Sequence, residues 1–539
     1  MCIPFFMKNA KKTLAKAEKA FDERRFSEAI KHYTKLIEFE PENFDYFFKR
    51  GQAYLRIEDF ESALNDCAKS VHINNTNINA LTNFGAALIR CQKINEAKDI
   101  LEYALDLDPN SFDALINIGN VYQALNMSEK GLQIAMRAIS INPVAAIAYN
   151  NLGTSLGDLN LDLEAKEAFL TAINLDEAYI PAVINFCQIE SKFGNHFETI
   201  AQYEKLLKNK KISQNESEMI KYYLSYSYLI TGQLELGWDY YDFGFNPIIP
   251  FAARRSKRVI SQPLWNGRED LKNKRLLVWR EQGLGDELEF ASCLPDLAAK
   301  LPKTNITVEC DARLVNIFKR MYPSFNVRIE LTNIDGTSIF NDYDYQLPMG
   351  SLPRLFRRNI DDFKNNQIKF NIQEELVKKS KERLSEFEEK ILVGICWRSG
   401  MLTVGRNLHY TNLADWAPLL ANKKIQLVNL QYGDCEQEII EFESVNNVKV
   451  LRWSDLNLKD NLEEVIALIS CLDYVATVAT AVAPLAGYAG ASTFLLIRED
   501  WIMLGETEFL PWSPNVKTFV SRLDESVAIN IEKIVPLIL

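Results

Sequence analysis

The sequence has few of the residues from which metal sites and disulfide frameworks are built. Its 539 residues include only four histidines, and no two of these lie at the spacing of metal ligands. Its nine cysteines are odd in number, scattered, and without a CxxC pair. We therefore expect no structural metal and no disulfide framework, and the reduced thiols predict a cytoplasmic protein.

Positive charge is also in short supply. The 61 lysines and arginines are outnumbered by 72 aspartates and glutamates, which gives a net charge of −11. Domains that bind nucleic acid usually carry a basic face, so we expect no nucleic-acid partner. Hydrophobic residues make up 47% and charged residues 25%, as in an ordinary soluble protein, and the length implies about three to four domain-sized units.

Long hydrophobic runs are rare. The N-terminus has a very short apolar stretch with lysines after it, the reverse of a secretory signal, and Met7 is an alternative start. One uncharged run, 475–497, has the length of a membrane span. It divides into a strand at 474–478, a helix of small residues at 480–490 and a strand at 492–497, as buried strands of a parallel sheet do. We therefore expect no integral membrane segment.

Four glycines recur at a fixed period. Gly51, Gly85, Gly119 and Gly153 are each 34 residues apart, and small residues follow each of them at the same two offsets. Small residues at these places let two helices pack closely. A period of this length with this layout is typical of a tetratricopeptide solenoid, which we expect over 10–211. A further helical pair is expected over 212–245.

An asparagine stands two residues before most of these repeat positions, at Asn83, Asn117, Asn151 and Asn185. A carboxamide offers both a hydrogen-bond donor and an acceptor, so a column of them could hold an extended peptide. This column resembles the asparagine ladder of the O-linked N-acetylglucosamine transferase superhelix, which implies a protein or peptide partner. The alternative is that asparagine merely fills this repeat position.

After a proline-containing and basic linker, 246–274, the pattern changes to short apolar strands alternating with helices. Such alternation predicts parallel sheets joined by right-handed crossovers. We expect an α/β region with two Rossmann-like lobes, 275–373 and 374–539, facing one cleft. The expected strands are 275–279, 306–310, 343–347, 391–397, 425–431, 474–478 and 492–497. The expected helices are 286–300, 312–321, 351–358, 374–389, 414–421, 462–472, 480–490 and 527–537.

Candidate site residues follow the first expected strand. Gly283 and Gly285 allow a tight turn, and a helix that begins there offers free N–H groups to an anion. Asp286 could act as a general base on an acceptor hydroxyl. The alternative for Asp286 is a helix cap, for which aspartate is a favoured residue.

Two further turns supply candidates in the second lobe. Arg398, Ser399 and Arg406 follow its first strand, and arginine is suited to binding diphosphate oxygens. Otherwise these arginines pair with local carboxylates on the surface. Thr480 lies in a turn of small residues where a phosphate could approach a helix N-terminus, although close helix–sheet packing explains the same residues.

These turns carry a second resemblance, from Trp265 to the end of the chain. The segment is similar to the glycosyltransferase-like domain fused to bacterial tetratricopeptide repeats, and through it to the ADP-heptose:lipopolysaccharide heptosyltransferases of the GT-B fold. The matching stretches are WREQGLGDELEFASCLPDL at 279–297, CDARLVNIFKRMYPSF at 310–325, DYQLPMGSLPR at 344–354, VGICWRSG at 393–400, NLQYGD at 429–434 and VATAVAPLAGYAG at 478–490.

The resemblance implies a metal-independent, inverting transfer from a nucleotide sugar, with no cofactor. It makes Asp286 the catalytic base and Arg406 a phosphate ligand, and it places the nucleotide-binding DTG..HLA motif of the family at 479–486. Here the aspartate of that motif is Ala479 and its histidine is Pro484. Two functions follow: a glycosyltransferase whose repeats bind a protein or glycan acceptor, or a catalytically inactive GT-B-like scaffold that acts through its repeats.

Overall fold

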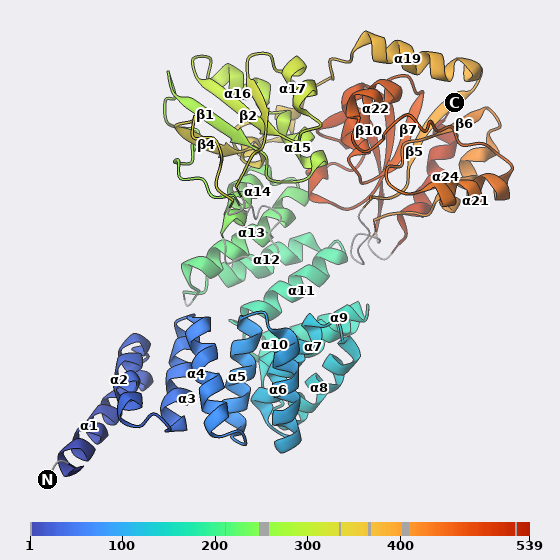
Figure 1. Ribbon diagram of the computed structural model, residues 1–539. Helices are drawn as coiled ribbons and strands as arrows, with labels where there is room; N and C mark the ends of the chain where they lie inside the picture. Colours follow the sequence, from blue (N-terminus) through green and yellow to red (C-terminus); the bar gives the residue numbers. More distant parts are fainter. Residues whose placement is uncertain are drawn as a thin grey trace. The chain divides into compact units, whose positions relative to one another are not determined.

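The computed structural model describes residues 3–210, 212–246, 258–333, 336–364, 368–400, 409–522 and 525–538 (Figure 1). The chain divides into two compact units, Met1–Ile189 and Glu190–Leu539. The repeat pattern predicted that the solenoid ends at 211, whereas this division lies inside one helix, α11. Each unit is described by itself.

The first unit is built from helical pairs, as the period of 34 residues predicted (Figure 1). Its helices are α1 Ile3–Asp22, α2 Phe26–Phe39, α3 Phe44–Arg56, α4 Phe60–Ile73, α5 Ile78–Arg90, α6 Ile94–Leu107, α7 Phe112–Ala124, α8 Ser128–Ile141, α9 Ala146–Asp158, α10 Asp162–Leu175 and α11 Ile180–Lys192. The prolines at 41, 109 and 143 each lie two residues beyond a helix end, where proline cannot interrupt the helical hydrogen bonds.

Each pair turns through a residue with a left-handed backbone, a feature that the sequence pattern did not predict. These residues recur every 34 positions with φ between 56° and 63°: Arg24, Glu58, Gln92, Asn126 and Asn160. Gly194, with φ 75°, continues the series. The left-handed conformation ends the first helix of a pair, and it costs about 1–2 kcal/mol for a residue with a Cβ atom.

The repeated glycines are places of close helix approach. A Cβ atom at Gly85 would lie 2.6 Å from Leu101, and one at Gly153 would lie 2.6 Å from the ring of Phe169. In both cases the neighbour is sixteen residues further along, on the second helix of the same pair. The glycine period therefore reports how tightly the two helices of each repeat pack.

The second unit begins with the helices α12 His196–Leu207, α13 Gln214–Ile230 and α14 Leu234–Tyr241, followed by two sheets. The first sheet is parallel, with the order β3-β2-β1-β4, and contains β1 Arg275–Trp279, β2 Asn305–Cys310, β3 Asn326–Ile329 and β4 Tyr345–Pro348. The second sheet has the order β6-β5-β7-β8-β10-β9 and is parallel except for its edge pair β10–β9. Its strands are β5 Ile391–Cys396, β6 Ile425–Asn429, β7 Tyr474–Val478, β8 Ser492–Arg498, β9 Phe509–Leu510 and β10 Ser513–Ser521.

Helices join the strands, and several differ from the predicted ones. The α-helices are α15 Leu284–Ala291, α16 Leu294–Lys300, α17 Val315–Met321, α18 Leu352–Phe356, α19 Glu374–Leu384, α21 Glu436–Asn446, α22 Leu462–Ile469, α23 Val482–Ala489 and α24 Ile531–Ile534. The single helix predicted over 286–300 is two helices, because Pro295 starts a new one. The stretch Leu413–Ala421 is a 3₁₀-helix that contains Pro418. The strands β3, β9 and β10 and the helix α21 were not predicted.

The described part of the predicted linker is packed against the first sheet. Val259 and Leu264 form isolated bridges with Thr337 and Gln346. Trp265 is fully buried, and the side chain of Arg258 is buried in an ion pair with Glu309. Residues 258–274 are therefore part of the fold, since each of these contacts holds them to it.

The uncharged run at 475–497 forms the predicted strand–helix–strand unit, from β7 through α23 to β8. Both strands lie inside the second sheet, which explains their continuous apolar sequence. Among the helices that the structure describes, none is long and apolar enough to span a membrane.

The glycines of α9 provide a matched test of helix packing. We predict that Gly153→Ala lowers the free energy of unfolding by about 1–3 kcal/mol, because its Cβ would overlap the buried ring of Phe169. In Gly157→Ala the nearest atom is 3.9 Å away, so the variant should gain up to about 1 kcal/mol of helix propensity. Urea unfolding followed by circular dichroism measures both, and equal effects of the two substitutions would contradict this account.

Candidate functional site

The second unit contains a cavity of about 720 Å³. Its lining comes from the turns that follow β1, β2, β5, β6, β7 and β8, and these turns include Asp286, Arg313, Ser399, Tyr432, Thr480 and Asp500. All of these turns lie at the carboxyl ends of parallel strands, where α/β folds place their ligands. Three segments that the sequence singled out, 283–286, 398–400 and 479–487, therefore contribute to one site.

The first wall of the cavity is the start of α15. The backbone N–H of Gly283 donates to Asp286 Oδ2 at 3.2 Å, so the aspartate does cap the helix. Asp286 also lines the cavity, as does Gly285, where a Cβ atom would meet Ala481 and Pro484 at 3.8 Å. The cap and the proposed base are thus compatible roles of the same carboxyl group.

Two more carboxyl groups line this part of the cavity, and neither was singled out from the sequence. They are Glu289, one turn beyond Asp286 on α15, and Asp500, directly after β8. Burial raises the pKa of Asp286 to about 6, and Asp500 adds to the rise. Burial, followed by the two neighbouring carboxylates, raises the pKa of Glu289 well above its usual range. Burial also raises the pKa of Asp500.

A cluster of aromatic rings fixes the turn that carries Asp500. Trp501 packs against Trp238 and Tyr241 of α14, with ring centroids 6.1 and 5.8 Å apart, and stacks on Phe290 of α15 at 6.0 Å. Trp512 packs against Trp238 and Phe290 as well, and its Nε1 donates to the Ile502 carbonyl at 3.0 Å. Helix α14, α15 and the turn after β8 therefore hold one another in place.

The turn before α15 is tied down by polar contacts. Gln282 Nε2 donates to the Tyr241 hydroxyl at 2.8 Å, and the backbone N–H of Gly350 donates to Glu281 Oε1 at 2.9 Å. These bonds connect the turn to α14 and to the end of β4. They position the start of α15, and with it Asp286, from the side remote from the cavity.

The opposite wall contains hydroxyl groups and the start of α23. Tyr432 donates to Ser399 Oγ at 3.4 Å, and both residues line the cavity. Thr480 lines it too, and its Oγ1 accepts from the backbone N–H of Val482 at 3.3 Å. Thr480 therefore contacts the first residue of α23, at the place where the sequence predicted a phosphate contact.

Arg398 does not lie where a phosphate ligand of the Asp286 cavity would be expected. Its guanidinium pairs with Glu438 on α21 and donates to the Asp434 carbonyl at 2.8 Å. It lines a second cavity of about 720 Å³, together with Tyr410 and Phe442, rather than the cavity of Asp286. The pairing with a local carboxylate is the alternative that the sequence left open. Arg406 lies outside the described residues.

Positive charge in the cavity of Asp286 comes from Arg313 and Lys459. Arg313 follows β2, donates to both carboxylate oxygens of Asp311 at 2.8 and 3.0 Å, and donates to the Lys459 carbonyl at 3.1 Å. Lys459 is exposed. Among the residues that the structure describes, no group of three or more histidine, cysteine, aspartate or glutamate side chains is arranged to hold a metal ion.

In the first unit, the asparagine column connects successive repeats. Asn117 Nδ2 donates to the Thr82 carbonyl at 3.5 Å, and Asn151 Nδ2 donates to the Ile116 carbonyl at 3.4 Å. Asn185 Nδ2 donates to the side chain of Asn150 at 3.0 Å, whereas Asn83 Nδ2 is buried without a partner in the described structure. The amide nitrogens thus serve packing between repeats.

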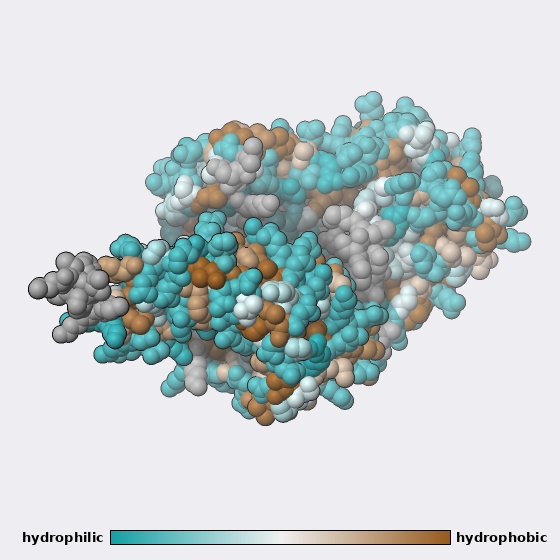
Figure 2. Space-filling view, turned by 60° about the horizontal axis from the view of Figure 1, so that its bottom comes forward, coloured by the Kyte–Doolittle hydropathy of each residue, from teal (hydrophilic) through white to brown (hydrophobic). Residues whose placement is uncertain are grey.

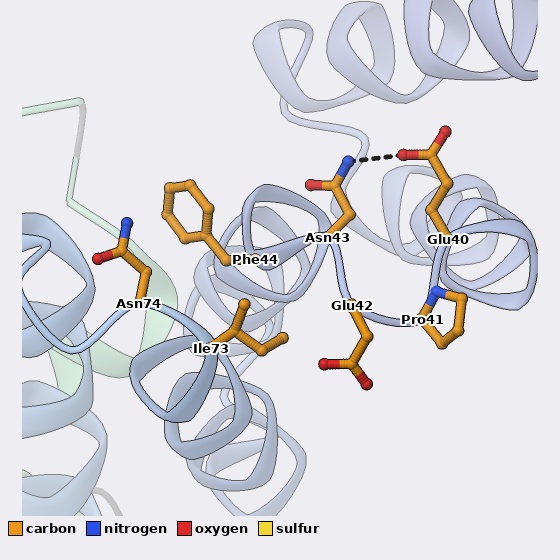
Figure 3. A pocket seen from close by; sticks show the side chains of 7 residues that line it. All are labelled: Glu40, Pro41, Glu42, Asn43, Phe44, Ile73 and Asn74. Atoms are coloured by element: carbon orange, nitrogen blue, oxygen red, sulfur yellow. Dashed lines mark hydrogen bonds between the residues drawn. The ribbon is translucent and has the colours of Figure 1, made fainter.

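The first unit also has a hollow of about 590 Å³ away from this column (Figure 3). It lies where α2 turns into α3 and is lined by Phe44, Ile73 and Glu40; the Glu40 carboxylate accepts from Asn43 Nδ2 at 2.8 Å (Figure 3). The face seen in Figure 2 carries only small, separate hydrophobic patches among hydrophilic residues.

The comparisons with known proteins concern mainly the repeats. The family model described as "Anaphase-promoting complex, cyclosome, subunit 3" matches residues 22–104, and the model described as "Tetratricopeptide repeat" matches 112–144 and 146–179. The helical solenoid at the N-terminus therefore consists of tetratricopeptide repeats and is a protein-interaction module.

One curated relative matches a larger part of the chain. Protein FlbA of Caulobacter vibrioides is 31% identical over 305 residues, which are 54% of this chain and 50% of FlbA. The chain thus spans about half the length of this relative.

Two solved structures are similar to parts of the chain. The crystal structure of MamA is 26% identical, with a TM-score of 0.29, over 31% of this chain and 92% of MamA. That of a thermophilic tetratricopeptide protein from Thermus thermophilus is 16% identical, with a TM-score of 0.32, over 34% of this chain and 99% of that protein.

The buried carboxyl groups predict a pH dependence of stability. Near pH 4 Glu289 is largely protonated in both the folded and the unfolded chain. As the pH rises, the unfolded chain releases this proton more readily, and the folded state loses stability. We predict that Glu289→Gln melts at nearly the wild-type temperature at about pH 4 and about 2–4 °C higher at about pH 8.

Thermal unfolding of both proteins across this range measures the difference. The exposed Glu388→Gln removes the same charge outside the cavity and should leave the melting temperature unchanged at both pH values. A Glu289→Gln variant that is destabilised at the higher pH would contradict the assignment of an uncompensated buried carboxyl group.

Proposed function

We propose that the second unit is a metal-independent, inverting glycosyltransferase of GT-B type, and that the tetratricopeptide solenoid binds its protein or glycan acceptor. The observation that carries the proposal is the position of Asp286. It lies at the start of a helix, in a cavity at the carboxyl ends of two sheets, and burial raises its pKa to about 6. A general base with such a pKa is ionised at neutral pH and still accepts a proton readily.

In the proposed reaction the Asp286 carboxylate takes the proton of an acceptor hydroxyl. The acceptor oxygen attacks the anomeric carbon of the donor sugar, and the bond from that carbon to the diphosphate oxygen breaks on the opposite face, so the configuration inverts. The nucleoside diphosphate leaves with its electron pair. Gly283 and Gly285 lie at the start of α15 and Thr480 lies at the start of α23, the two helix starts that would contact the donor, where backbone N–H groups favour anions. Ser399, which lines the cavity after β5, would contact the donor through its hydroxyl group.

The cation that would neutralise the leaving group is not Arg398, whose guanidinium pairs with Glu438. Arg313 and Lys459 lie in the same cavity as Asp286 and could take part. We keep Arg406 in the proposal on the resemblance alone. Preorganised positive charge is the usual means of stabilising a diphosphate leaving group when no metal is present.

On the solenoid, we propose that the carboxamide oxygens of Asn117, Asn151 and Asn185 accept hydrogen bonds from an extended peptide. Their amide nitrogens are used between repeats, whereas the contacts of the described chain leave these oxygens without a donor. These oxygens form a column of hydrogen-bond acceptors, one in each successive repeat. An extended peptide has regularly spaced backbone N–H groups that could donate to them.

A second candidate function is a catalytically inactive scaffold. It is favoured by Ala479 and Pro484, which replace the two nucleotide-binding side chains expected from the resemblance. Pro484 is buried and lines the cavity of Asp286. In this case the chain acts only through its tetratricopeptide repeats.

The two functions are separated by Asp286→Asn. If the chain is an enzyme, we expect one nucleotide sugar to raise the melting temperature of both the wild-type protein and Asp286→Asn, because a ligand that binds only the folded state stabilises it. Release of nucleoside diphosphate then falls by about 10²–10⁴-fold in the variant, and the wild-type rate rises with pH through about 6, where Asp286 loses its proton. If no nucleotide sugar at millimolar concentration shifts the melting temperature, the scaffold is favoured.

A further inference from the structure

Glu289 is a buried carboxyl group without a partner. Only 3% of the residue is exposed, it lines the cavity, and in the described structure its side chain makes no hydrogen bond and no ion pair. It lies three residues after Asp286 and four after Gly285 on α15, so all three lie on the face of the helix that lines the cavity. A buried carboxyl group normally has a hydrogen-bond or charge partner, so its absence here points to a ligand.

The surroundings of Glu289 are acidic. Asp286 and Asp500 are close enough to act electrostatically on it, and both line the same cavity. No described lysine, arginine or histidine forms an ion pair with any of these three groups. Arg313, which also lines the cavity, is held by both oxygens of Asp311. This end of the cavity therefore holds three carboxyl groups that no described cation balances.

The missing partner must be compatible with this arrangement. A divalent metal ion does not fit, because the described carboxyl groups are not arranged to share one. An anionic group placed directly against Glu289 is disfavoured, because Asp286 and Asp500 lie beside it. A protonated amine has three N–H donors, needs only one or two of the carboxylates, and is also attracted by an aromatic face such as that of Trp501, which lines the cavity.

We propose that Glu289 and Asp500, at the end of the cavity beside Asp286, bind the ammonium group of an amino sugar. The ammonium group would keep Glu289 ionised and would be the charged partner that Glu289 lacks in the described structure. If the proposed glycosyl transfer is correct, the sugar of the donor carries an amine, and Glu289 selects it over a neutral sugar of the same shape. The amine binding itself does not depend on that reaction.

The inference is tested by comparing glucosamine with glucose, which differs from it in having a hydroxyl group in place of the amine. Titration of the full-length protein at neutral pH, followed by saturation-transfer nuclear magnetic resonance, gives both affinities. We expect wild-type protein to bind glucosamine about tenfold or more tightly than glucose, the order of one hydrogen bond between charged groups. Glu289→Gln should reduce this preference to about twofold or less.

Glu388→Gln is the control, because it removes an exposed carboxylate outside the cavity. It should keep the wild-type preference. The inference is overturned if wild-type protein binds glucose as well as glucosamine, if it binds neither, or if Glu289→Gln keeps the preference. No nucleotide is present in this titration, so its outcome does not depend on whether the protein binds a nucleotide sugar. The amine site and the glycosyltransferase function can therefore fail separately.

Discussion

The packing of Trp501 is the interaction on which the candidate site depends. Its ring lies against Trp238 and Tyr241 on one side and Phe290 on another, so it joins a helix of the N-terminal part of the second unit to α15 and to the turn after β8. Aromatic pairs of this kind contribute about 0.5–1.5 kcal/mol each beyond the area that they bury. A change in this cluster would move both Asp286, which is near Phe290, and Asp500, which precedes Trp501.

This constraint explains why acidic groups can be held together in a cavity. Burial disfavours the charged form of a carboxyl group, and it is the first cause of the raised pKa values of Asp286, Glu289 and Asp500. Neighbouring carboxylates add to the rise at Asp286 and Glu289. Such an arrangement persists only if the surrounding packing stabilises the fold by more free energy than the burial of the carboxyl groups costs. Unfavourable electrostatics in a cavity is a common property of functional sites, where binding of a ligand removes it.

The sequence predicted the parts of the fold that depend on local pattern. The 34-residue period located the helical pairs, and β1 and β7 were predicted with their observed bounds, since apolar runs between turn residues mark buried strands. Strand β10 was missed because polar residues interrupt its apolar ones, so that it has neither a continuous apolar run nor a regular alternation. The role of Arg398 depended on Glu438, which lies on a helix that was not predicted. Glu289 and Asp500 are about two hundred residues apart, and only the tertiary fold brings them together.

The most direct test of the account is a crystal structure of the full chain with the nucleoside diphosphate that raises its melting temperature most. The account predicts the diphosphate in the cavity against the 479–483 turn, with its terminal phosphate facing Asp286 across open space large enough for a sugar. A nucleotide bound at another place, or protein side chains filling the space in front of Asp286, would contradict the account and favour an inactive scaffold.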